Sequence, residues 1–156
     1  MGEGKSAVKV LLVCSSGGHL AQLYRLRPWW SRHERVWVTF GHPQAVSLLR
    51  GEGMVPAFSP TTRNIPNAAR NLRLAIKVIR AERPDVVISD GAGLAFPFFI
   101  VARLLGVHTV YLEVYDRITR PTLTGRLCYP LSSLFLVQWP EQAISYPRGK
   151  LIGCLL

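Results

Sequence analysis

The chain has 156 residues, enough for one domain with a hydrophobic core (1–156), and no repeat or linker indicates a second domain. Nineteen basic residues against nine acidic ones give a formal net charge of +10, which favours phosphorylated ligands, acidic lipid surfaces or nucleic acid as partners. We expect no signal peptide and no membrane-spanning helix, because no run of about 18 apolar residues is present. The cysteines, Cys14, Cys128 and Cys154, lack metal-ligand spacing and predict reduced thiols.

Short apolar segments alternate with helical patterns along the chain. The predicted strands are Val8–Cys14, Arg35–Thr39, Val55–Phe58, Val86–Ser89, His108–Leu112 and Leu134–Val137. The predicted helices are Leu20–Trp29, Pro43–Arg50, Asn67–Glu82, Phe96–Leu105 and Leu123–Leu131. This order predicts an α/β fold, a Rossmann-like parallel sheet with helices on both faces. Because such sheets bind ligands at the carboxyl ends of their strands, the loops after the strands are the candidate site.

The most informative loop follows the first predicted strand, where Ser15-Ser16-Gly17-Gly18-His19 leads directly into a helix. A glycine pair at such a turn lets backbone N–H groups converge on an anion, and the missing Cβ atoms allow a phosphate to approach closely. His19, at the mouth of the turn, can donate a hydrogen bond or exchange a proton near neutral pH. A tight turn with a capping histidine is an equally open alternative.

Two further loops fall at the same edge of the predicted sheet. The fourth strand ends in Ser89-Asp90-Gly91-Ala92-Gly93, and the fifth ends in Glu113-Val114-Tyr115-Asp116-Arg117. Two glycine turns beside an acidic and basic cluster predict a site more strongly than any one of them. Glu113 ends a buried strand, where an unpaired carboxylate is costly, and Arg117 is its expected partner. Asp90 is a weaker candidate for acid–base chemistry.

Two predicted helices carry expectations about the surface. In the helix over 67–82, one face holds Leu72, Ala75, Ile76 and Ile79, and the other holds Arg70, Arg73, Lys77 and Arg80. The basic face is either solvated or in contact with anionic lipid. The segment 96–101 opens a helix with apolar residues on every side. Part of it is expected to fill the core, and the rest to meet a membrane together with Arg103.

Taken together, these loops resemble those of a known family. The chain is similar to the acceptor-binding subunits of split glycosyltransferases of the GT-B type. It resembles the anchoring subunit of the eukaryotic enzyme that adds the second N-acetylglucosamine to dolichol-linked chitobiose, and it resembles the bacterial capsule and exopolysaccharide members more closely than that subunit. The matching segments span essentially the whole chain, at 15–20, 89–93, 113–117, 121–127, 137–141 and 146–153.

The resemblance implies half an enzyme, the N-terminal half of a GT-B transferase whose nucleotide-sugar-binding half is a separate polypeptide. It implies inverting transfer of N-acetylglucosamine or another hexose from a UDP-sugar to a polyprenyl-diphosphate-linked saccharide, with no activity until the partner binds. No cofactor or metal is expected. Because the N-terminal transmembrane anchor of the eukaryotic members is missing, we expect peripheral attachment to an anionic surface at the cytoplasmic face of the membrane.

Particular residues receive roles from this resemblance. His19 is the expected catalytic base, and Glu113 competes with it unless it only pairs with Arg117. The acceptor diphosphate is expected at Ser16, Gly17, Gly18, Asp90, Gly91, Gly93 and Arg117. The partner subunit is expected to dock on Trp139, Tyr146, Leu151, Ile152 and Leu155, since aromatic and aliphatic side chains commonly anchor such contacts. A tail packed against its own sheet is the alternative.

Three other functions fit the sequence less well. A nicotinamide-binding domain would need G-x-G-x-x-G and an acidic residue after the second strand, where Val38-Thr39-Phe40-Gly41-His42 has none. A serine hydrolase built on Ser15 or Ser16 would need G-x-S-x-G. Nucleic-acid binding agrees with the charge, but no recognised module is present and the apolar content is high.

Overall fold

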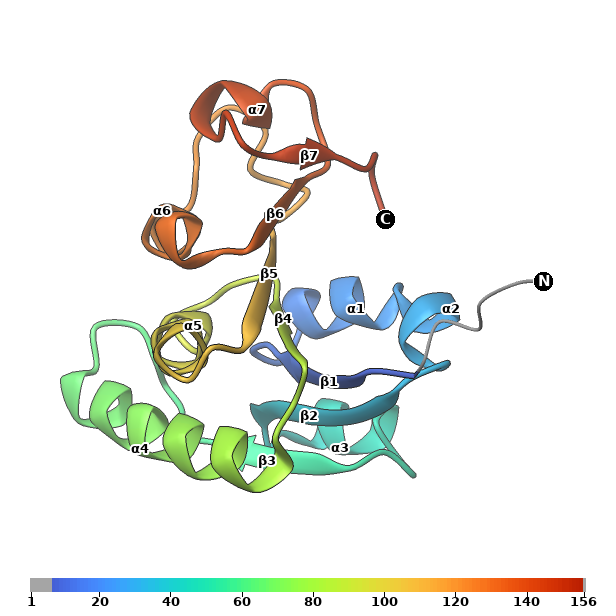
Figure 1. Cartoon of the computed structure of the whole chain (residues 1–156), viewed down its shortest axis with the longest axis vertical. Coiled ribbons are helices and arrows are strands. Elements are labelled where there is room, and N and C mark those ends of the chain that lie inside the picture. Colours follow the sequence, from blue (N-terminus) through green and yellow to red (C-terminus); the bar gives the residue numbers. More distant parts are fainter. Residues whose placement is uncertain (1–6, 156) are drawn as a thin grey trace.

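The computed structural model describes residues 7–155, which form a parallel sheet between two layers of helices (Figure 1). The strands are β1 (Lys9–Val13), β2 (Glu34–Phe40), β3 (Met54–Ala57), β4 (Val86–Ser89), β5 (His108–Leu112), β6 (Leu134–Val137) and β7 (Lys150–Leu151). The helices are α1 (Gly18–Tyr24), α2 (Arg27–Trp30), α3 (Pro43–Leu48), α4 (Ile65–Glu82), α5 (Ala95–Leu104), α6 (Leu123–Cys128), η1 (Tyr129–Leu131) and α7 (Gln142–Ser145). Every pair of neighbouring strands is parallel, in the order β3-β2-β1-β4-β5-β6-β7.

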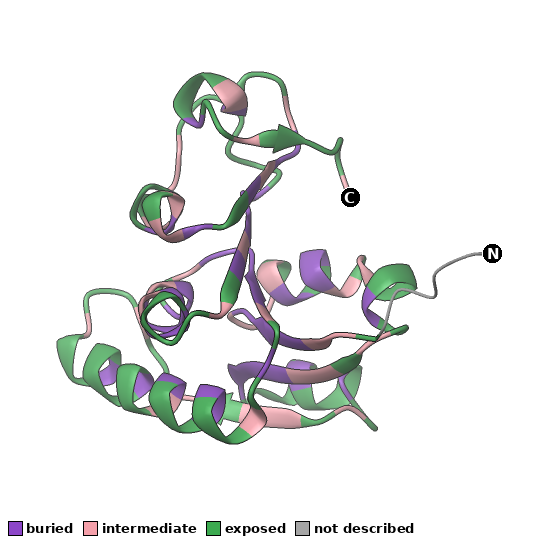
Figure 2. Cartoon of the chain, viewed as in Figure 1, coloured by how far each residue is buried: buried purple, intermediate pink, exposed green. Residues whose placement is uncertain are grey.

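Each face of the sheet has its own hydrophobic core, and the buried strands lie between them (Figure 2). On one face, α4, α5 and α6 pack over Tyr111 and Phe135, with Phe98 and Phe99 of α5 fully buried. On the other face, α1, α2 and α3 pack over the first strands around Trp37. Because both faces are apolar, the strands appear in the sequence as continuous apolar runs. The predicted fold class is confirmed.

The predicted elements match the structure except near prolines and at the C-terminal end. All six predicted strands are present, within about two residues of their expected ends. The predicted helix 20–29 is two helices, because Pro28 lacks the N–H needed to continue α1 and instead opens α2. Likewise, α6 gives way to a 3₁₀ turn at Pro130. The short α7 and β7 were not expected.

The chain order of the strands creates a crevice at the carboxyl edge of the sheet. From β1 the chain proceeds outward to β2 and β3, and it then crosses back through α4 to place β4 on the other side of β1. The loops after β1 and β4 therefore leave neighbouring strands in opposite directions. Such a switch point is where open α/β sheets bind their ligands.

The helices α4 and α5, for which surface contacts were predicted, differ partly from the prediction. On α4, Ala75 and Ile79 are buried as expected, but Leu72 and Ile76 are each 37% exposed. The apolar run of α5 mostly fills the core, and its exposed end is Leu104. Among residues 7–155, no helix is both long and apolar enough to cross a membrane.

Candidate active site

A histidine–aspartate pair lies at the switch point. His19 is at the start of α1, and Asp90 follows β4 directly. Nδ1 of His19 is 3.1 Å from the backbone oxygen of Asp90 and 3.4 Å from its Oδ1. Since both neighbours are acceptors, Nδ1 carries the proton in the neutral ring, and the free lone pair is on Nε2. The side chain of Asp90 is fully buried, whereas that of His19 is 29% exposed, so the imidazole is the accessible member.

The two groups perturb each other's titration. Burial raises the pKa of Asp90 to about 6, even though the hydrogen bond and positive charge of His19 act in the opposite direction. Burial by itself would lower the pKa of His19, but the hydrogen bond and charge of Asp90 outweigh it and raise this pKa above its usual value. The hydrogen bond from Nδ1 to Asp90 leaves Nε2 free to take a proton, as a general base requires.

A chain of buried glutamines connects this pair to the other loops of the site. Gln22 of α1 donates to Oδ2 of Asp90 at 3.1 Å and accepts from the backbone N of Tyr115 at 3.2 Å. It also accepts from Gln138 at 2.8 Å, and Gln138 in turn donates to the backbone oxygen of Glu113 at 2.9 Å. The loops after β1, β4, β5 and β6 are thus braced as one unit. A buried hydrogen-bond network of this kind rigidifies a site.

The glycines of the two turns serve different purposes. Gly17 has a φ of +84°, which favours glycine, and no atom lies within 4 Å of the Cβ position of either Gly17 or Gly18. These two residues therefore face open space, as the expected approach of a phosphate requires. A Cβ on Gly91 would meet the Tyr111 hydroxyl, and one on Gly93 would lie 3.0 Å from Cβ of Thr61. The second turn is therefore glycine-rich because its neighbours pack closely.

Glu113 is a bracing residue in this structure. It is fully buried and accepts hydrogen bonds from the Val114 backbone N (3.0 Å), the Thr122 hydroxyl (3.1 Å) and the Tyr146 hydroxyl (2.5 Å). Burial and the adjacent carboxylate raise the pKa of Tyr146, so its hydroxyl remains a donor. Gly125 lies against this cluster, and a Cβ there would overlap both the carboxylate and the Tyr146 hydroxyl.

Two expectations about this region are therefore wrong. Within the described part of the chain, no ion pair joins Glu113 to Arg117, because Thr122 and Tyr146 already occupy the carboxylate. Arg117 is exposed, and its backbone oxygen accepts from the side chain of Gln142 at 3.1 Å. Tyr146, expected at the partner interface, is only 1% exposed and belongs to the core. Because Glu113 is buried and its oxygens accept these hydrogen bonds, it is a weaker candidate for the catalytic base than His19.

The remaining C-terminal residues stay accessible at one edge of the sheet. Leu151 is 50% exposed and Ile152 is 40% exposed, although β7 pairs with β6. Leu155 is half-buried, and its backbone N donates to Gln138 at 2.9 Å. Trp139 is half-buried and donates to the backbone oxygen of Tyr115 at 2.6 Å. The tail thus combines both alternatives, packing against its own sheet and docking of the partner. Its backbone pairs with the sheet, while the side chains of Leu151 and Ile152 remain exposed for a contact.

The three buried glutamines that brace the site were not predicted from the sequence. Gln138 was within a matching segment, but Gln22 and Gln142 carried no motif. Gln22 is buried on α1 between Leu20 and Leu23, and a polar residue on an apolar helix face was the one available signal.

Comparison with known proteins identifies the family. The model of the family described as "Oligosaccharide biosynthesis protein Alg14 like" matches residues 59–155, more than half of the chain. The chain belongs to this family. The UDP-N-acetylglucosamine transferase subunit ALG14 of Yarrowia lipolytica is 25% identical over 175 residues, covering 95% of this chain and 81% of the relative. The ALG14 of Eremothecium gossypii is 31% identical over 112 residues, covering 68% of this chain and 50% of the relative. The narrower resemblance to bacterial capsule members stays a prediction.

Solved structures agree on the fold. MurG of Acinetobacter baumannii superposes with a TM-score of 0.71 at 15% identity, covering 85% of this chain and 42% of MurG. A glycosyltransferase of Rickettsia africae superposes with a TM-score of 0.71 at 11% identity, covering 95% of this chain and 43% of that enzyme. The chain spans less than half the length of these structures. It has the fold of the N-terminal half of a GT-B glycosyltransferase, as the sequence predicted.

Proposed function

We propose that this chain is the acceptor-side subunit of a two-component inverting glycosyltransferase. It would move N-acetylglucosamine, or another hexose, from a UDP-sugar to a saccharide carried on a polyprenyl diphosphate. The observation that carries the proposal is the His19–Asp90 pair at the switch point of a fold that corresponds to half of a transferase. Membership of a family whose relatives are named UDP-N-acetylglucosamine transferase subunits supports the choice of donor.

The chemistry follows from the protonation states of the pair. As the acceptor hydroxyl attacks C1 of the donor sugar, its oxygen forms the new bond, the bond from C1 to the UDP oxygen breaks, and UDP leaves. The hydroxyl proton passes to Nε2 of His19. The Asp90 carboxylate, close to Nδ1, stabilises the imidazolium that results. The open face of Gly17 and Gly18 and the exposed Arg117 are proposed to receive the acceptor diphosphate.

The partner subunit is proposed to dock on the part of the sheet that α1 and α2 leave uncovered. An apolar groove of about 380 Å³ lies there over β4, β5 and β6, lined by Ile88, Val110, Leu134 and Leu136. Ile152 of the tail also lines it, so the groove continues into the accessible C-terminal edge. Apolar area of this kind on one face favours a protein contact. The proposed interface therefore comprises Leu151, Ile152 and the groove, without the buried Tyr146.

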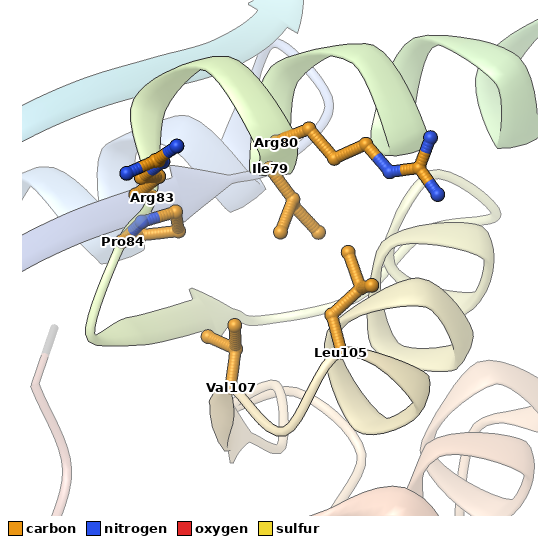
Figure 3. Close-up of a pocket in the computed structure, with 6 residues that line it drawn as sticks. All are labelled: Ile79, Arg80, Arg83, Pro84, Leu105 and Val107. Carbon is orange, nitrogen blue, oxygen red and sulfur yellow. The ribbon is translucent and has the colours of Figure 1, made fainter.

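The membrane contact is proposed for the opposite side of the molecule, between α4 and α5. The exposed side chains of Leu72, Ile76 and Leu104 line a groove of about 290 Å³, with Arg80 among its walls. A neighbouring pocket of about 440 Å³ lies between Ile79 and Leu105, and Figure 3 shows Arg80 beside it. Apolar side chains flanked by arginine suit peripheral binding to an anionic lipid surface.

A transfer assay tests the function directly. The chain, its co-expressed nucleotide-sugar-binding partner, radiolabelled UDP-N-acetylglucosamine and a polyprenyl-diphosphate-linked saccharide should give product only when both proteins are present. His19→Ala should lower turnover by about 10² to 10⁴ while the two subunits still co-purify. His108→Ala is the matched control, since His108 is exposed at the amino end of β5. Full activity of the chain alone, or unchanged turnover of His19→Ala, would contradict the proposal.

A further inference from the structure

A second pocket opens beside the histidine–aspartate pair at the same edge of the sheet. It has a volume of about 480 Å³, and the loops after β1, β2, β3 and β4 all contribute to it. Ser16 comes from the turn that carries His19, and Ala92 comes from the turn that carries Asp90. His42 and Thr62 come from the two loops between them in the sequence. The volume is within the usual range for small-molecule sites.

The lining of this pocket is polar but uncharged. Five of its nine residues carry hydroxyl groups, one is a histidine, and none is lysine, arginine, aspartate or glutamate. The members with hydroxyls are Ser15, Ser16, Ser59, Thr61 and Thr62. Hydroxyl groups both donate and accept hydrogen bonds, so they suit a ligand that is itself rich in hydroxyls. Arginine and lysine are the side chains that usually bind a diphosphate, and this lining has neither, whereas Arg117 is exposed outside it.

One wall of the pocket is held rigidly by two buried asparagines of α4. Asn71, which is 1% exposed, exchanges two hydrogen bonds of 2.9 Å with the backbone of Phe58. Asn67, which is 5% exposed, donates to the backbone oxygen of Pro60 at 2.9 Å. The loop is also packed against the β4 turn where Thr61 meets Gly93. Preorganised loops of this kind reduce the entropy cost of binding a ligand.

His42 is positioned as the main polar group of the pocket. Its Nδ1 is 2.7 Å from the Ser16 hydroxyl, which fixes the orientation of the ring. The ring is also tilted against Phe40, with the centroids 5.6 Å apart. The side chain is exposed, so its other nitrogen is accessible to a ligand. Phe40 and Pro60 add the apolar surface that small-molecule sites usually have.

We infer that this pocket binds the neutral sugar ring of the acceptor, with His42 and Thr62 as the residues that recognise it. This inference rests on the proposed function, because it assumes that the acceptor hydroxyl is delivered to His19. A sugar ring bound between Ser16 and Ala92 would contact the two turns that carry His19 and Asp90. The diphosphate then lies outside this pocket, and Ser16 contacts the sugar instead of the phosphate.

Steady-state kinetics of the reconstituted pair test the assignment. His42→Ala should raise the KM for the lipid-linked saccharide about tenfold, and Thr62→Val about threefold, which are the losses expected for one or two hydrogen bonds. The kcat and the KM for the UDP-sugar should change less than twofold, and His108→Ala should change neither KM. An unchanged acceptor KM in both variants, or a raised KM for the UDP-sugar instead, would overturn the inference.

A binding measurement on the full chain alone separates this inference from the proposed function. Methyl N-acetyl-β-glucosaminide should shift the NMR resonances of the His42 ring in the wild-type chain, and the Thr62→Val variant should need more sugar for the same shift. If inorganic phosphate shifts His42 and the sugar does not, the pocket is an anion site and the inference fails. If the sugar binds but the reconstituted pair transfers nothing, the pocket assignment stands while the proposed function fails.

Discussion

Gly125 is where the packing of the site is most sensitive to a single methyl group. Its Cβ position overlaps an oxygen of Glu113 and the Tyr146 hydroxyl, and it lies 2.8 Å from Oγ1 of Thr122. We expect Gly125→Ala to force these groups apart and to break at least one hydrogen bond to the buried carboxylate. The substitution therefore tests whether Glu113 braces the loop after β5.

The size of the effect can be worked out from three contributions. Overpacking a core position costs about 1 to 3 kcal/mol. Losing a hydrogen bond to a charged group costs about 1.5 to 3 kcal/mol. Replacing glycine by alanine inside a helix stabilises the folded state by about 1 kcal/mol. The net loss is about 1.5 to 5 kcal/mol, which for a chain of this size lowers Tm by roughly 3 to 20 °C.

Thermal and urea unfolding followed by circular dichroism measure this loss. Gly18→Ala is the matched control, because Gly18 is also helical and no atom lies within 4 Å of its Cβ position. The control should be as stable as the wild type or up to about 1 kcal/mol more stable. If Gly125→Ala unfolds at the same temperature as Gly18→Ala, the contact between Gly125 and the Glu113 cluster is not as described.

Three further substitutions address the catalytic pair and the two proposed surfaces. The transfer rate should fall at low pH, where His19 gains a proton. Because Asp90 raises the pKa of His19, Asp90→Asn should move this fall in rate to lower pH. A pH–rate profile in which the fall does not move would contradict the coupling of the two groups. Leu134→Asp should abolish co-purification with the partner but leave flotation with anionic liposomes intact. Leu104→Asp should abolish flotation but leave co-purification intact. Loss of both co-purification and flotation in either variant would refute the separation of the two surfaces.

Most of the fold was predictable because the six predicted strands are short apolar runs and the longest helix, α4, is amphipathic. The exceptions are elements too short to have a pattern. The β7 strand has only two residues, and one of them is Lys150. Similarly, the break at Pro28 depends on a single residue within an otherwise helical segment, since the helical spacing of the apolar residues continues past it.

The site was predictable where it depends on local turns and not where it depends on long-range contacts. The turns that carry His19 and Asp90 were visible because glycines mark them. The hydrogen bond from Gln22 to Asp90 spans 68 positions in the chain, and the one from Gln138 to Gln22 spans 116. Tyr146 was expected at the partner interface because it follows the last predicted strand and aromatic side chains commonly anchor such contacts, but its hydroxyl donates to Glu113, 33 positions away in the chain.

If this chain is the acceptor-side subunit, it should bind the acceptor but not the nucleotide sugar, and a comparison of ligand binding measures this. Equilibrium dialysis of the purified chain against radiolabelled polyprenyl-diphosphate-linked saccharide and, separately, against radiolabelled UDP-N-acetylglucosamine gives the two affinities. We expect saturable binding of the lipid-linked saccharide that weakens in Arg117→Ala, with no saturable binding of the nucleotide sugar. Tight binding of UDP-N-acetylglucosamine without binding of the saccharide would contradict this expectation.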